Sequence, residues 1–336
     1  MRLMNPVKPA IRVCVALLAL VLLVSTVSCK PKSGDSGKLR VGLMPKLIGI
    51  DFFNACERGA REAANELGVD LVYDGPTAAD VTKQAEMLDT WITRRLDVIA
   101  VAPNDPNALA PTLKRARAAG IKVLTWDADS NPADSRDYFV NQATPESMGF
   151  GLVDLMARLL NEKGKVAIIT GSLTAANQNI WIGFMKQRLP KYPDLELVTI
   201  LPSEENQSLA FRVAQDLLKS YPDIDGIWGL TSVSLPGTAE AVRQAGKSGK
   251  IVVTGLSTPK QMSQYVHDGT VDEFMLFSPV DLGYLSVQVA KLVTDQGSLG
   301  PTIAAGRLGT ITVSDQTVLL GDPMLFNIDN VDNFDF

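Results

Sequence analysis

Residues 111–126, PTLKRARAAGIKVLTW, contain the unit on which our fold prediction rests: an amphipathic helix, a stop at Gly120, a short turn and an apolar strand. Glycine commonly ends a helix because it adopts the left-handed backbone conformation without steric cost. Residues 239–255, AEAVRQAGKSGKIVVTG, repeat this unit with the stop at Gly246. We therefore expect helices to lead into strands in both halves of the chain.

Outward from these two units, short β-rich segments alternate with amphipathic helices. The predicted strands cover residues 39–44, 70–73, 98–102, 123–126, 138–140, 166–170, 196–200, 226–230, 251–255 and 273–277. The predicted helices cover residues 54–67, 80–93, 107–119, 145–161, 178–189, 207–220, 235–245 and 260–267. Strands that alternate with helices of 10–15 residues indicate βαβ units and a parallel sheet. The sequence therefore predicts an α/β fold with two doubly wound, Rossmann-like lobes.

The N-terminus has the pattern of a secretory signal. Three basic residues, Arg2, Lys8 and Arg12, precede an apolar run over residues 13–24. This run is too short to cross a bilayer. Small residues then lead to Cys29. We predict a signal peptide over residues 1–28.

Residues 26–29, TVSC, resemble a bacterial lipobox, in which the cysteine is lipidated and becomes the mature N-terminus. Leu is usual where Thr26 stands, and an ordinary cleaved signal is the alternative. Residues 30–37 have no periodicity and are typical of a flexible linker. We expect residues 29–37 to be a lipid-anchored linker that holds a membrane-attached lipoprotein in the periplasm or cell envelope.

The charge and cysteine counts exclude several classes of protein. Without Arg2, Lys8 and Arg12, the chain has 29 basic and 37 acidic residues, a net charge of about −8. This acidic balance argues against nucleic-acid partners and against an anionic membrane face. Cys14 leaves with the signal and Cys29 would carry lipid, so Cys56 has no partner for an internal disulfide.

The sequence lacks the usual signatures of an enzyme. It contains no Walker A loop, G-x-S-x-G, C-x-x-C or H-E-x-x-H motif. The single histidine, His267, lies at the C-terminal end of a predicted helix, where a basic side chain interacts favourably with the helix dipole. We predict a protein that is not an enzyme and holds no metal or cofactor.

Polar and aromatic side chains follow the predicted strands, where open parallel sheets bind their ligands. The candidates are Lys46, Phe52, Phe53, Asn104, Asp127, Asp129, Gln142, Asn177, Gln178, Trp181, Thr231, Pro236, Ser257 and Phe277. Carboxylates and amides hold adjacent sugar hydroxyls, and aromatic rings pack on sugar C–H faces. Turn, cap and core roles remain open for many of them, including packing for Phe52, Phe53 and Trp181.

Several stretches resemble type I periplasmic solute-binding proteins of ABC sugar importers, and within them the autoinducer-2 and rhamnose branch. The stretches are residues 44–49 (MPKLIG), 52–53 (FF), 73–77 (YDGPT), 124–129 (LTWDAD), 141–142 (NQ), 177–179 (NQN) and 255–259 (GLSTP). The resemblance implies two α/β lobes joined by three crossing segments, with the ligand between the lobes. The expected N-terminal lobe is residues 38–141 plus 279–299, and the expected C-terminal lobe is residues 142–278 plus 300–336.

The autoinducer-2 pattern implies contacts from Lys46, Asp127, Gln178, Pro236 and positions 177 and 238. Asn177 stands where that pattern has Asp, and Thr238 stands where it has Ala. Residues 177–179 look more like rhamnose binders, whereas residues 126–129 look more like autoinducer-2 binders. Ser257 replaces the Asp of ribose-type relatives, which argues against ribose.

The expected function is capture without chemistry. A monomeric, extracytoplasmic substrate-binding lipoprotein would hold a rhamnose-like monosaccharide between its lobes and deliver it to the membrane permease of an ABC transporter. The alternative ligand is autoinducer-2, for uptake or signalling. A receptor that serves a sensor kinase is a second class. A secreted carbohydrate enzyme that uses Asp127 and Asp129 is a third.

Overall fold

Residues 37–336 are described by a computed structural model. The predicted signal peptide, Cys29 and the predicted linker up to residue 36 lie outside the described residues. Leu39–Phe336 forms one compact unit. No helix within the described part of the chain combines the length and the apolar character needed to cross a membrane.

The first sheet is buried between helices because its inner strands are apolar on both faces. β1 (Arg40–Met44), β2 (Asp70–Tyr73), β3 (Val98–Val101), β4 (Lys122–Trp126) and β5 (Tyr138–Asn141) pair in parallel in the order β5-β4-β3-β1-β2. In β3, Val98 and Ala100 enter one core, while Ile99 and Val101 enter the other. Since successive strand side chains point to opposite faces, both faces must be covered by helices.

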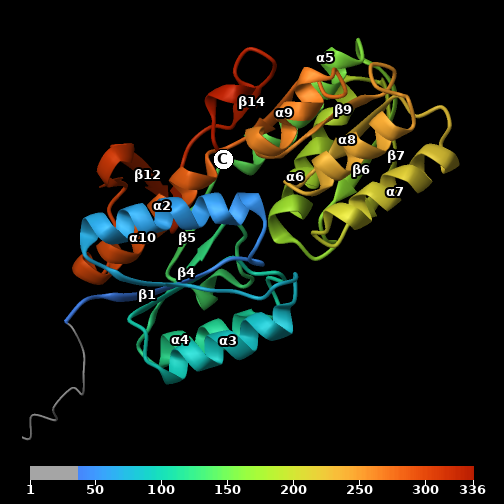
Figure 1. Cartoon of the computed structure of the whole chain (residues 1–336). Coiled ribbons are helices and arrows are strands. Elements are labelled where there is room, and N and C mark those ends of the chain that lie inside the picture. The colour runs from blue at the N-terminus through green and yellow to red at the C-terminus, as the bar shows by residue number, and fades with distance from the viewer. Residues whose placement is uncertain (1–36) are drawn as a thin grey trace, which may run out of the picture. The chain divides into compact units, whose positions relative to one another are not determined.

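Two pairs of helices cover these faces (Figure 1). α2 (Asp51–Leu67) and α10 (Pro279–Gln296) pack together on one side, and α3 (Val81–Thr93) and α4 (Ala110–Ala118) pack together on the other. The first pair is very close: a Cβ at Gly59 would lie 1.8 Å from the carbonyl oxygen of Val280. Likewise, a Cβ at Gly283 would lie 1.9 Å from the carbonyl oxygen of Cys56. These two glycines therefore allow α10 to return to the first sheet.

The second sheet is built in the same way. β6 (Lys163–Thr170), β7 (Asp194–Pro202), β8 (Gly226–Gly229) and β9 (Val252–Gly255) are parallel, in the order β7-β6-β8-β9. α5 (Pro145–Leu159) packs on α6 (Ala176–Arg188), and α7 (Gln207–Ser220) packs on α8 (Ser234–Gln244), which also contacts α9 (Pro259–His267). β10 (Phe274–Leu276) pairs antiparallel with β14 (Met324–Phe326).

The predicted α/β fold with doubly wound parallel sheets is confirmed. Each of the ten predicted strands overlaps one of β1–β10, and each of the eight predicted helices overlaps one of α2–α9. The prediction did not include helix α10 or the short strands β11 (Thr302–Ala304), β12 (Thr310–Ser314), β13 (Thr317–Leu319) and β14.

The placement of residues 300–336 in the C-terminal lobe is wrong for most of that segment. β11, β12 and β13 extend the first sheet, because β13 pairs in parallel with β5, with Val318 opposite Val140. Only β14 returns to the second half, through its pairing with β10. The partner of a short strand depends on residues far away in the sequence, so the local pattern could not reveal it.

Candidate functional site

A cavity lies between the carboxyl ends of the strands of the two sheets. Its volume is about 50 Å³. The lining residues come from both sheets: Lys46, Ile50, Phe52, Phe53, Asp127, Asn177, Gln178, Trp181, Glu205, Leu230, Thr231, Ser232, Leu256, Leu276 and Phe277. This position matches the general rule that open parallel sheets bind ligands beyond their strand ends.

The first sheet contributes Lys46 and Asp127. Lys46 follows β1, and Asn104 holds its loop by donating from Nδ2 to the Lys46 carbonyl oxygen at 2.8 Å. Asp127 follows β4 and has a left-handed backbone with φ of 61°. Aspartate enters this region more readily than most residues, and non-glycine residues held there often lie at functional sites. Both side chains are buried.

The second sheet contributes Asn177 and Glu205. Asn177 lies in the first turn of α6, and Glu205 follows β7 with φ of 49°. Gln178 positions Glu205, because its Nε2 donates to Glu205 Oε1 at 2.7 Å. The other end of the Gln178 amide is held too, since Oε1 accepts from Thr170 Oγ1 at 2.6 Å and from the Gly171 amide at 2.7 Å.

Polar groups from the two sheets meet in the cavity. Lys46 Nζ donates to Asn177 Oδ1 at 3.0 Å and lies 3.7 Å from Asp127 Oδ2 and 4.0 Å from Glu205 Oε1. Asn177 Nδ2 donates to Asp127 Oδ2 at 3.4 Å. One buried ammonium therefore faces two buried carboxylates.

Among the charged groups of this cluster, Asp127 has a shifted pKa. Burial raises the pKa of Asp127 to about 6, the negative charge of Glu205 adds to the rise, and the ammonium of Lys46 opposes it. The Asp127 carboxylate thus keeps its charge at neutral pH at a free-energy cost that a hydrogen-bonding ligand would reduce.

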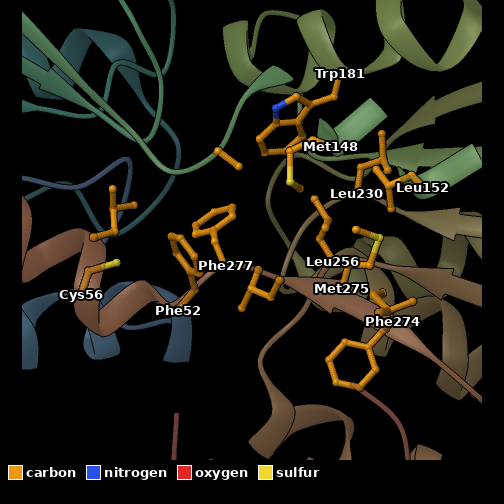
Figure 2. Packing of buried hydrophobic residues seen from close by; sticks show 14 of the residues in the cluster. Phe52, Cys56, Met148, Leu152, Trp181, Leu230, Leu256, Phe274, Met275 and Phe277 are labelled. Carbon is orange, nitrogen blue, oxygen red and sulfur yellow. The ribbon is translucent and has the colours of Figure 1, made fainter. Parts of the chain in front are cut away.

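Aromatic rings form the apolar wall of the cavity. The ring of Phe52 meets the rings of Phe53 and Phe277 edge to face, with centroids 5.0 Å and 5.8 Å apart. Figure 2 shows Phe52 beside Phe277, with Trp181 and Leu256 reaching toward them from the other side. Rings in this arrangement can cover the C–H face of a ring-shaped ligand.

With Asp129 and Trp181 set aside, the sequence predicts thirteen ligand-binding residues, and the structure brings eight of them together. Lys46, Phe52, Phe53, Asp127, Asn177, Gln178, Thr231 and Phe277 line the cavity. Asn104, Gln142, Pro236, Thr238 and Ser257 do not line it.

The five others have other surroundings. Asn104 supports the Lys46 loop. Pro236 and Thr238 are buried within α8, where Thr238 Oγ1 donates to the Ser234 carbonyl oxygen at 2.7 Å. Ser257 Oγ donates to the Ser232 carbonyl oxygen at 2.9 Å. Gln142 is buried, and neither its Oε1 nor its Nε2 has a partner within the described residues.

The sequence prediction missed Glu205 and left Trp181 among the packing residues. The rule that identified Lys46 and Asp127 also finds Glu205, which comes three residues after β7. The predicted strand ended at residue 200, five residues before Glu205. The cavity has five further lining residues. One is polar, Ser232, and the others are apolar and gave no signal in the sequence: Ile50, Leu230, Leu256 and Leu276.

Other candidates from the sequence lie apart from this cavity. Asp129 forms a two-point ion pair with Arg136 at 2.6 and 2.8 Å, so it does not face Asp127 as a second catalytic acid. His267 ends α9 and pairs with Asp332 at 2.8 Å. Cys56 is a free thiol in the core. Within residues 37–336, no cluster of three or more acidic, histidine or cysteine side chains could hold a metal ion.

Comparison with known families identifies the class of protein that this fold and site define. Residues 41–298 match the family described as periplasmic binding protein domain. The chain therefore belongs to this family. A curated relative is the D-ribose/D-allose-binding protein of Pseudomonas aeruginosa, which is 27% identical over 279 residues, covering 77% of this chain and 85% of the relative.

Solved structures agree. A sugar ABC transporter from Actinomyces odontolyticus is 35% identical with a TM-score of 0.71, covering 88% of this chain and 97% of that one. A solute-binding protein from Clostridium phytofermentas with bound L-rhamnose is 26% identical, with a TM-score of 0.83 and coverage of 88% and 98%. LsrB from Clostridium saccharobutylicum in complex with AI-2 is 27% identical, with a TM-score of 0.84 and coverage of 88% and 100%.

Proposed function

We propose that this chain is the extracytoplasmic substrate-binding component of an ABC transporter, which captures a small sugar and delivers it to a membrane permease without chemical change. The observation that carries this proposal is the cavity in which Lys46, Asp127, Asn177 and Glu205 meet from two sheets. A ligand that contacts both sheets at once would stabilise one relative position of the two sheets while it is bound.

The chemistry of the cavity suits a polyol. Lys46 donates, the carboxylates of Asp127 and Glu205 accept, and a sugar hydroxyl can do both. Phe52 and Phe277 offer edges and faces to the C–H side of the ring. The curated relative and the rhamnose-bound structure named above support a sugar as the ligand.

Binding is proposed to proceed by hinge closure of two lobes. In this proposal, one lobe comprises residues 38–141 with 279–319, and the other comprises residues 142–278 with 320–336. The three crossings then lie before α5, before α10 and between β13 and β14. The closed form would present both lobes to the permease at once.

For the ligand itself we propose a neutral, rhamnose-like monosaccharide, with autoinducer-2 as the second candidate. Asn177 supports the neutral sugar, because an amide supplies donors where autoinducer-2 binders have a carboxylate. The similarity to the rhamnose-bound structure and the similarity to the AI-2-bound structure are comparable. Membership of the autoinducer-2 and rhamnose branch is part of this proposal.

The proposed setting is the periplasm or cell envelope. We propose that residues 1–28 are removed, that Cys29 carries lipid, and that the chain acts as a monomer on its tether. Mass spectrometry of the protein purified from a bacterial membrane fraction tests the anchor: a diacylglyceryl mass on Cys29 supports it, and an unmodified N-terminus contradicts it.

A thermal-shift screen tests the function, because a ligand that binds only the folded state raises the melting temperature. The panel contains L-rhamnose, D-ribose, D-allose, D-arabinose and autoinducer-2, and calorimetry then gives affinities for each compound that shifts the transition. We expect a saturable shift with L-rhamnose or a close analogue. A panel without any shift contradicts sugar binding, and release of a modified sugar from the purified protein contradicts the non-enzymatic function.

A further inference from the structure

Glu205 is a charged residue of the cavity for which the resemblance to autoinducer-2 binders supplied no role. The residue is 8% exposed and belongs to the loop after β7. The neighbouring Glu204 has the same left-handed φ of 49°, but its side chain is exposed. The loop thus presents two glutamates and sends only one of them into the cavity.

The surroundings of Glu205 leave space for its carboxylate. A Cβ at Gly171 would lie 2.3 Å from Glu205 Oε1, so a residue with a side chain at 171 would displace this oxygen. Gln178 Nε2 donates to the same oxygen at 2.7 Å. Gly171, Gln178 and the left-handed loop together keep the carboxylate at one position.

The balance of charge in the cavity is negative. Among the residues that line it, Lys46 is the cation, while Asp127 and Glu205 are the anions. Lys46 lies within 4.0 Å of both carboxylates, so one ammonium is shared between two acids. A third anion in this space would have no remaining cation to pair with.

Two carboxylate oxygens of the cavity are open acceptors. Asp127 Oδ2 accepts from Asn177 and Glu205 Oε1 accepts from Gln178. The other oxygens, Asp127 Oδ1 and Glu205 Oε2, accept no hydrogen bond from residues 37–336. These two oxygens need donors from the ligand, which a hydroxyl group supplies and an ionised carboxylate or phosphate group does not.

We propose that Glu205 is a specificity-determining residue that restricts the site to uncharged sugars and excludes sugar acids and sugar phosphates. This inference rests on the proposed sugar-binding function and narrows its substrate class. Repulsion between like charges in a water-poor site amounts to several kcal/mol, which corresponds to a discrimination of about a hundredfold or more.

The experiment compares neutral sugars with their anionic counterparts by calorimetry. The pairs are L-rhamnose and L-rhamnonate, D-ribose and D-ribose 5-phosphate, and D-galactose and D-galacturonate. Titrations are made at pH 8, where Asp127, with its pKa of about 6, is ionised. The wild-type protein should bind at least one neutral sugar and should bind the matching anion at least about a hundredfold more weakly.

Two variants separate the charge of Glu205 from its place in the loop. Glu205→Gln removes the charge and keeps an oxygen that can accept from Gln178. Its ratio of neutral to anionic affinity should fall at least about tenfold. Glu204→Gln makes the same change on the exposed neighbour and should leave the ratio unchanged.

The outcomes distinguish this inference from the proposed function. Wild-type affinities for a sugar and its anion that agree within a few-fold overturn the role of Glu205, and so does an unchanged ratio in Glu205→Gln. If the wild-type protein binds none of the compounds, the proposed function is overturned and this inference with it. Because the wild-type ratio is itself a test, a poorly folded variant does not leave the question open.

Discussion

Lys46 Nζ lies 3.0 Å from Asn177 Oδ1, although Lys46 lies in the loop after β1, Asn177 lies in the first turn of α6, and 131 positions separate them in the chain. Each residue follows the first strand of its own sheet, β1 and β6. The hydrogen bond is buried, so it joins the halves of the candidate site without competition from water. Lys46 therefore links the two sheets, and in the proposed function it also donates to the ligand.

Replacing Lys46 by Met should weaken both sugar binding and the fold. The change leaves Asp127 and Glu205 buried without their cation, and breaking such a pair costs about 3–5 kcal/mol. Denaturant unfolding at pH 8 should show a loss of this order, and calorimetry should show no measurable sugar binding. Lys83→Met is the control, because Lys83 pairs with Glu86 on the surface. Equal stability of the two variants would contradict the role of Lys46.

Replacing Asp127 by Asn should weaken sugar binding and change the pH dependence of stability. Since burial raises the pKa of Asp127 to about 6, its carboxyl contributes most to stability below its unfolded pKa of about 3.9, and this contribution is lost as pH rises through 6. Between pH 5 and pH 8, the ligand-free wild type should lose about 1–2 kcal/mol relative to Asp127→Asn.

The same variant should bind sugar about tenfold to a hundredfold more weakly, the value of a charged hydrogen bond. Asp129→Asn is the matched control, because Asp129 pairs with Arg136 and does not line the cavity. It should lose stability and keep its affinity. Parallel pH profiles of wild type and Asp127→Asn would show that Asp127 is not perturbed by burial.

Gly59→Ala should strongly destabilise the fold. The new methyl group would overlap the Val280 carbonyl oxygen and push α2 away from α10, and such overpacking costs about 1–3 kcal/mol or more. Gly183→Ala on α6 is the control, since a Cβ there meets nothing within 4 Å. It should stabilise the protein by about 0.5–1 kcal/mol through helix propensity. Melting curves of both variants test these opposite changes in stability. Equal or higher stability of Gly59→Ala would contradict the close contact between α2 and α10.

Sugar binding should change the fluorescence of Trp181. The chain has four tryptophans, and Trp181 is the one named among the cavity-lining residues. Trp91 belongs to α3 and is buried in the core that α3 covers, and the indole N–H groups of Trp126 and Trp228 donate to backbone carbonyls. We expect Trp181→Phe to remove most of the ligand-induced change and Trp91→Phe to retain it. A full response in Trp181→Phe would place the ligand elsewhere.

The sequence predicted the parts of the site that depend on strand ends. Lys46, Asp127 and Asn177 follow the carboxyl ends of predicted strands, and all three line the cavity. The same rule selected Ser257 and Pro236, which are buried but do not line the cavity. The rule identifies a sheet edge, but the direction of each side chain depends on local hydrogen bonds, such as the one from Ser257 to Ser232.

The alternation of helices and strands, with Gly120 and Gly246 as stops, determined the α/β class, because these signals come from neighbouring residues along the chain. Only the tertiary structure decided that β13 pairs with β5, that Glu205 rather than Glu204 enters the cavity, and that Gly171 makes room for its carboxylate. These features join residues far apart in the sequence. Their energies arise from contacts that exist only after the chain has folded.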